Sequence, residues 1–125
     1  MVSSELIDQI TNDFKFVLSN PNIKGVVLFG SYLTGDETDR SDIDICLVAP
    51  NQNLYQLHKF IYSQIEKNCK DYEIRFFEEL PLYIQGVIIE NGIVILSPDL
   101  GDLSEYFYSY RKQWVHEKWR FESLK

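Results

Sequence analysis

The most informative stretch of this chain is residues 28–48, LFGSYLTGDETDRSDIDICLV. The stretch begins in an apolar run at 25–29, passes Gly30-Ser31, and reaches Asp42-x-Asp44 after ten further residues. A second apolar run, 42–48, includes the two aspartates. Runs of this length and composition predict strands, and the polar segment between them predicts a turn with some helical character.

Two carboxylates share one face of the second predicted strand. Asp42 and Asp44 are two residues apart, so their side chains point the same way, and the residues facing the core are Ile43, Ile45 and Leu47. Mg²⁺ prefers hard oxygen ligands, and paired carboxylates can hold one or two such ions against substrate phosphates. The spacing therefore predicts a magnesium site.

The residues that flank the carboxylates suit a phosphate. Gly30 ends a strand without a side chain, so the backbone there can approach a phosphate closely, and Ser31 adds a hydroxyl donor. Ser41 directly precedes Asp42 and either orients that carboxylate or is an ordinary turn residue. An Asp-x-Asp pair alone is usually a loop or cap, but the four-residue pattern arises by chance in roughly one chain of this length in a thousand.

The remaining chain alternates helices and strands. Apolar residues at helical spacing predict further helices, and short apolar runs predict further strands. The expected helices are 4–19, 53–67, 81–90 with Pro81 in its first turn, and 102–121, and the added strands are 72–77 and 93–96. This order predicts an α/β or α+β sheet covered by helices.

Composition narrows the class of protein. The chain has 125 residues, 45% of them hydrophobic and 25% charged, which predicts one globular domain over 1–125. A net charge of −7 makes nucleic acid a poor partner. The chain shows no signal peptide and no run of ~20 apolar residues, so we expect a cytoplasmic protein without membrane contact. Cys46 and Cys69 lack neighbouring histidines, so we expect reduced thiols, with Cys46 in a core strand.

The Gly30-Ser31 and Asp42-x-Asp44 pattern resembles the signature of the minimal nucleotidyltransferases of the DNA polymerase β superfamily. Residues 72–84 and 105–114 also resemble later segments of archaeal and bacterial members, so the resemblance covers nearly the whole chain. It implies the polymerase β-like nucleotidyltransferase fold, a small mixed sheet packed on one side by helices.

In the family, a third carboxylate, usually Asp, lies on the strand after the helix that follows Asp-x-Asp. Glu73 stands at the matching place, although its extra methylene alters the reach of the carboxylate. Asp71 is the alternative, and a surface pairing of Glu73 with Arg75 is the structural reading. The resemblance thus implies catalytic and metal-binding roles for Asp42, Asp44 and Glu73, and NTP-binding roles for Gly30, Ser31 and Ser41.

Four other polar residues have weaker assignments. Arg40 and Arg75 either neutralise the triphosphate or are solvated. His58 and His116 have no candidate nucleophile beside them in sequence, so we expect structural or exposed side chains.

The resemblance implies Mg²⁺-dependent transfer of a nucleoside monophosphate, with AMP from ATP favoured, to an acceptor hydroxyl. It suggests an antitoxin that attaches AMP to a tyrosine of a helical HEPN toxin. The alternatives are a noncatalytic nucleotide-binding or protein-binding subunit, and a small-molecule nucleotidyltransferase completed by a partner subunit. A homo-oligomer also stays open.

The C-terminal helix carries more aromatic residues than one stripe can bury. Its expected core stripe consists of Leu103, Phe107, Tyr110, Trp114 and Phe121. Tyr106, Tyr108 and Trp119 are left over on other faces, which predicts a protein-binding surface there.

Overall fold

The computed structural model describes residues 3–30, 43–65 and 72–123, with side chains up to Glu117. The described strands form one sheet in the order β3-β2-β1-β4. Strand β1 (Gly25–Phe29) pairs antiparallel with β2 (Ile43–Val48) and with β4 (Ile93–Leu96), while β2 pairs parallel with β3 (Tyr72–Phe76). The sheet is therefore mixed, as the family resemblance implies.

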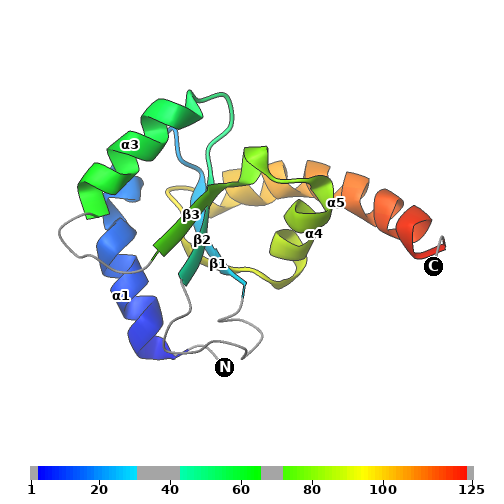
Figure 1. The fold of residues 1–125 in the computed structure, drawn as a ribbon, viewed down its shortest axis with the longest axis horizontal. Helices are drawn as coiled ribbons and strands as arrows, with labels where there is room; N and C mark the ends of the chain where they lie inside the picture. Colours follow the sequence, from blue (N-terminus) through cyan, green and yellow to red (C-terminus); the bar gives the residue numbers. More distant parts are fainter. Residues whose placement is uncertain (1–2, 31–42, 66–71, 124–125) are drawn as a thin grey trace.

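Helices cover both faces of this sheet (Figure 1). On one side lie α1 (Ser4–Phe14), the short 3₁₀ helix η1 (Lys15–Ser19) and α3 (Leu54–Ile65). On the other lie η3 (Phe77–Glu79), α4 (Leu82–Asn91) and α5 (Leu100–Ser123). The expectation of helices on one side only is wrong.

The reason lies in β1 and β2, whose side chains are apolar on both faces. Val26 and Ile45 enter a first core cluster with residues of α1 and α3. Val27 and Cys46, one position further along each strand, enter a second core cluster with residues of η3, α4 and α5. Because successive side chains of a strand point to opposite faces, both faces need a covering layer.

Most element boundaries fall within two residues of expectation. The exception is the first helix. Helix α1 begins at the Ser3 cap, whose Oγ accepts the Leu6 N–H at 3.1 Å, and it tightens into η1 after Phe14 instead of continuing as one α-helix to residue 19. Pro81 caps α4 instead of lying within its first turn.

Helix α5 begins two residues earlier than expected because Asp99 caps it, with the Asp102 N–H donating to Asp99 Oδ1 at 3.1 Å. It lies across the second face of the sheet and then extends beyond α4 to the C-terminus (Figure 1). None of the helices in the described residues combines the length and apolar character needed to cross a membrane.

Candidate active site

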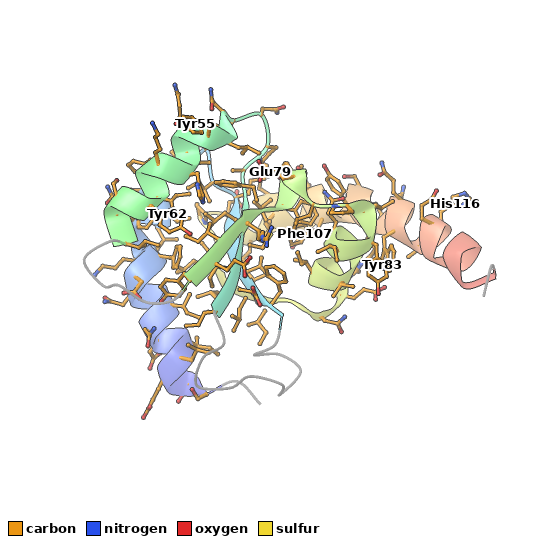
Figure 2. All side chains as sticks on the ribbon, viewed as in Figure 1. Tyr55, Tyr62, Glu79, Tyr83, Phe107 and His116 are labelled. Atoms are coloured by element: carbon orange, nitrogen blue, oxygen red, sulfur yellow. The ribbon has the colours of Figure 1, made fainter. Side chains whose placement is uncertain are left out.

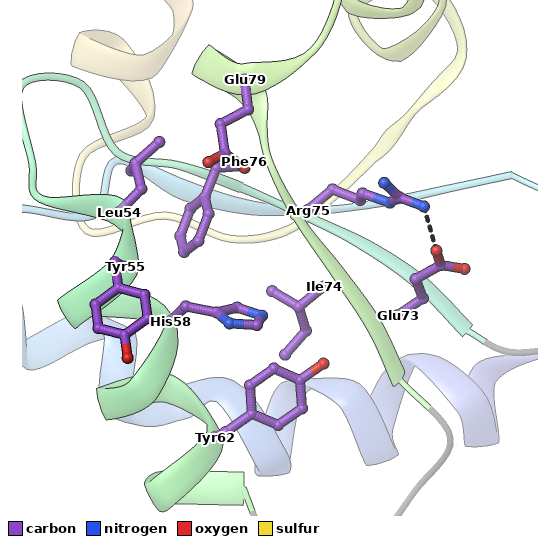
Figure 3. Close-up of a pocket in the computed structure, with 9 residues that line it drawn as sticks. All are labelled: Leu54, Tyr55, His58, Tyr62, Glu73, Ile74, Arg75, Phe76 and Glu79. Carbon is purple, nitrogen blue, oxygen red and sulfur yellow. Dashed lines mark hydrogen bonds and ion pairs between the residues drawn. The ribbon is translucent and has the colours of Figure 1, made fainter.

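Two candidate carboxylates lie side by side in the sheet. In the parallel pairing of β2 with β3, Asp44 is the register partner of Glu73. Their neighbours Ile43 and Ile74 face the first core cluster, so both carboxylates project from the opposite face. Figure 3 shows Glu73 on the side of β3 away from Ile74. Adjacent strands are about 4.8 Å apart, which places the two acidic groups within reach of a shared cation.

Gly30 completes this corner of the sheet from the other side of β2. Phe29 lies opposite Asp44 in the pairing of β1 with β2, and Gly30 follows directly with a φ of +87°. A Cβ at Gly30 would lie 2.1 Å from Asp44 Oδ2. Glycine is therefore required both by the left-handed backbone and by the approach of the carboxylate.

Arg75 forms an ion pair with Glu73 on the exposed surface of β3, with Arg75 Nη2 donating to Glu73 Oε1. The two residues are two positions apart on one strand, so their side chains share a face. The expected surface pairing of Glu73 with Arg75 is thus confirmed. The ion pair also leaves the carboxylate on the same face as Asp44, so it does not exclude a role in the site.

A buried pair anchors the start of β3. The Tyr72 hydroxyl donates to Asp13 Oδ2 of α1 at 2.6 Å, and Gln9 Nε2 donates to the same hydroxyl at 3.4 Å. Burial, followed by the bond to Asp13, raises the pKa of Tyr72 above its ordinary range. The pair fixes the residue before Glu73. A charged residue inside the apolar pattern of Ile10, Phe14 and Val17 is the sequence signal that could have revealed it.

A groove of about 540 Å³ runs between α3 and β3. Its helical wall carries Tyr55, His58 and Tyr62, and its strand wall includes Ile74 and Phe76 (Figure 3). His58 is exposed, as expected, and contacts the Tyr62 ring at 4.6 Å between centroids. No pattern in the sequence indicates this groove.

The prediction for Cys46 is confirmed. It is a buried free thiol in β2. Desolvation, with a smaller contribution from the charge of Glu78, raises the pKa of the thiol far above its usual value. His116 is exposed on the part of α5 that lies away from the sheet (Figure 2).

The aromatic residues of α5 divide differently than expected. Leu103 and Trp114 are buried, and Phe107 and Tyr110 pack against the second core cluster. Tyr106 packs there too, and its hydroxyl donates to Glu78 Oε2 at 2.8 Å, so assigning it to a separate face was wrong. The Phe77 ring of η3 lies among the rings of Tyr106, Phe107 and Tyr110, which lets one core include adjacent helical positions.

Several predicted residues lie outside the described part of the chain. These are Ser31, Arg40, Ser41, Asp42, Cys69 and Asp71, and the side chains of Trp119 and Phe121. Among the described residues no group of three or more His, Cys, Asp or Glu side chains could hold a metal ion. The described members of the site, Asp44 and Glu73, supply hard oxygen ligands of the kind that Mg²⁺ binds.

Comparison with known proteins identifies the family of this chain. Residues 9–100 match the family described as Polymerase beta, Nucleotidyltransferase. A protein of Methanocaldococcus jannaschii named as a proposed protein adenylyltransferase is 47% identical over 90 residues, which cover 72% of this chain and 68% of that protein.

Solved structures show the same fold. A toxin–antitoxin MntA–HepT crystal structure matches with a TM-score of 0.61 at 14% identity, over 98% of this chain and 95% of that chain. The complex of a tri-AMPylated Shewanella oneidensis HEPN toxin with its MNT antitoxin matches with a TM-score of 0.60 at 16% identity, over 94% and 91%. On the family match and the close archaeal relative, this chain belongs to the polymerase β nucleotidyltransferase family and is a nucleotidyltransferase.

Proposed function

We propose that this nucleotidyltransferase uses Mg²⁺ and ATP to transfer AMP to a tyrosine hydroxyl of a HEPN-type toxin, and so acts as its antitoxin. The observation that carries the proposal is the register pairing of Asp44 with Glu73 beside Gly30. It supplies two acidic groups and a glycine without a side chain at one corner of the sheet. The name of the archaeal relative and the complexes formed by the structural neighbours support AMP and a HEPN partner.

The proposed roles follow the chemistry of each residue. Asp42 and Asp44 hold the metal ion, with Glu73 as the third carboxylate. Gly30 and Ser31 receive the triphosphate, and Ser41 orients Asp42. Mg²⁺, when bound, supplies positive charge that neutralises the phosphates.

The transfer breaks a phosphoanhydride bond of ATP and forms a phosphoester bond to the acceptor. The acceptor oxygen bonds to the α-phosphorus, the bond from that phosphorus to the bridging oxygen breaks, and pyrophosphate departs. The hydroxyl proton passes to Glu73, which lies on the same face as Asp44 and can act as general base. Arg75 pairs with this carboxylate and keeps it positioned on the exposed side of β3.

The test incubates the chain with a HEPN-type protein, Mg²⁺ and ATP labelled at the α-phosphate, and locates the label by peptide mass spectrometry. We expect AMP on a tyrosine, and loss of transfer when the metal is chelated. Asp44→Asn should slow transfer about 100-fold or more, since it removes a metal-binding charge at constant volume.

The matched control is Asp8→Asn, which removes an exposed carboxylate on α1 and should leave transfer unchanged. Full activity of Asp44→Asn would contradict the assigned site. Transfer only to small hydroxyl compounds, or ATP binding without transfer, would instead favour one of the alternative functions.

A further inference from the structure

Strand β3 forms one end of the sheet. The order β3-β2-β1-β4 leaves its outer edge unpaired by any strand within residues 3–30, 43–65 and 72–123. An edge strand presents backbone N–H and C=O groups that can pair with a further strand. Natural proteins usually guard such edges with charge, and β3 carries two charges, Glu73 and Arg75.

The charges of β3 are arranged symmetrically about Ile74. The strand reads Tyr72-Glu73-Ile74-Arg75-Phe76, with an aromatic residue at each end and opposite charges inside. In an antiparallel pairing centred on Ile74, Glu73 of one copy lies opposite Arg75 of the other, and Tyr72 lies opposite Phe76. Opposite charges directly across two strands stabilise the pairing, while Tyr72 and Phe76 are already buried in the first core cluster of their own chain. The sequence that guards this edge against other strands is thus complementary to itself.

We propose that two copies of this chain form a two-fold dimer in which their β3 strands pair antiparallel about Ile74. The two sheets then become one continuous sheet. Residue pairs across the contact are reciprocal, as a two-fold interface requires.

The four charges of such a contact alternate in sign. Within each strand Arg75 already pairs with Glu73. Across the contact each Glu73 gains Arg75 of the second copy, so every adjacent pair is attractive and only the diagonal pairs are alike. The strand is neutral although the whole chain has a net charge of −7. The second copy therefore contributes a guanidinium to the candidate carboxylate.

Helix α3 supplies further contact area beside the strand. Tyr55 is 70% exposed and Tyr62 is 39% exposed, and both line the groove between α3 and β3 (Figures 2 and 3). A two-fold axis perpendicular to the sheet at Ile74 places the second α3 on the same face, across this groove. Exposed tyrosines are favoured anchors of protein interfaces.

The test measures mass by light scattering during size exclusion of the full-length chain. We expect a dimer of twice the 14.7 kDa chain mass. Arg75→Glu and Glu73→Arg each place like charges across the contact, and each should weaken dimerisation about tenfold or more. Lys112→Glu makes the same change of charge as Arg75→Glu at an exposed position of α5 and should leave the dimer intact.

Charge complementation decides the outcome even if one variant folds poorly. Mixing Arg75→Glu with Glu73→Arg should give a heterodimer, and the double variant E73R/R75E should dimerise again although it lacks Glu73. This recovery does not depend on the proposed transfer reaction, so either idea can fail alone. A monomeric wild type, or a dimer unaffected by Arg75→Glu, would overturn the proposal. So would loss of toxin binding in these variants with no change in self-association, because another protein would then occupy the edge.

Discussion

Gly30 and Asp44 fit together so closely that one added methyl group would collide, since a Cβ at Gly30 would lie 2.1 Å from Asp44 Oδ2 and 2.8 Å from its Cγ. Gly30→Ala should therefore displace the carboxylate, in addition to about 1–2 kcal/mol of left-handed backbone strain. We expect AMP transfer to fall at least about tenfold, because catalysis by phosphoryl-transfer enzymes depends on positioning. Transfer rates and urea unfolding of the same preparation measure the two effects.

Gly101→Ala is the matched control for this change. Gly101 lies in the first turn of α5, and within the described part of the chain a Cβ there would meet only Asp99 Oδ1, at 3.4 Å. Helix propensity favours the change by up to about 1 kcal/mol. Stability should hold or rise and transfer should be unchanged. Undiminished transfer by Gly30→Ala would show that the fit to Asp44 does not matter for the reaction.

Glu73→Gln should lower kcat more than it lowers ATP affinity, because the proposed role of Glu73 concerns the acceptor proton and not the triphosphate. Single-turnover transfer and equilibrium ATP binding separate the two quantities. Asp71→Asn is the comparison, since Asp71 is the alternative third carboxylate. A silent Glu73→Gln together with an inactive Asp71→Asn would move the role to Asp71.

Tyr72→Phe should destabilise the chain by about 1–3 kcal/mol, because it removes the hydroxyl that donates to the buried Asp13 carboxylate. The free energy of unfolding in urea measures this. Tyr55→Phe makes the same chemical change on an exposed side chain and should stay within about 0.5 kcal/mol of wild type. Equal stabilities for the two variants would mean that water replaces the lost donor at Asp13.

We expect the chain to lose stability at alkaline pH because the Cys46 thiol is buried. Burial raises the pKa of its thiol from the ordinary 9.0, so above about pH 9 the unfolded chain releases a proton that the folded chain keeps. This contribution is complete below pH 9 and falls by about 1.4 kcal/mol per pH unit above it. Tyr72 and Tyr106 shift in the same direction from an ordinary 10.0, so they act at higher pH.

Urea unfolding between pH 8 and about pH 10, in a Cys69→Ser background, isolates the thiol. Cys46→Ala should reduce the fall of the free energy of unfolding with pH above pH 9. If the free energy of unfolding falls equally with pH in both proteins, groups other than Cys46 cause the loss of stability.

Local patterns predicted the elements of the fold well. The alternation of Ile43, Asp44 and Ile45 already placed the carboxylate away from the first core cluster, and the structure agrees. The pairing of Asp44 with Glu73 is different in kind, because it depends on the register of two parallel strands that are separated by α3. Register between distant segments is set by packing of the whole sheet, which no short stretch of sequence encodes.

The errors arose where two elements share one core. Apolar residues at successive positions of β1 and β2 imply covering layers on both faces of the sheet. Which helices form the second layer depends on where α4 and α5 pack. Tyr106 looked surplus by helical spacing. It is accommodated because Glu78 and Phe77 of η3 meet its hydroxyl and its ring, and η3 is too short to leave a periodic signal.

The two candidate carboxylates stand on strands that open to solvent in different ways. Strand β2 has a hydrogen-bonded neighbour on each edge and apolar cover on each face, so exchange of its amide hydrogens requires unfolding of the chain. Strand β3 has a described neighbour on one edge only, and its amides can exchange through fraying of that strand in the isolated chain. The backbone amide of Asp44 should therefore be among the slowest to exchange. The amides of β3 should exchange faster, although the buried bond between Tyr72 and Asp13 limits fraying at the start of that strand.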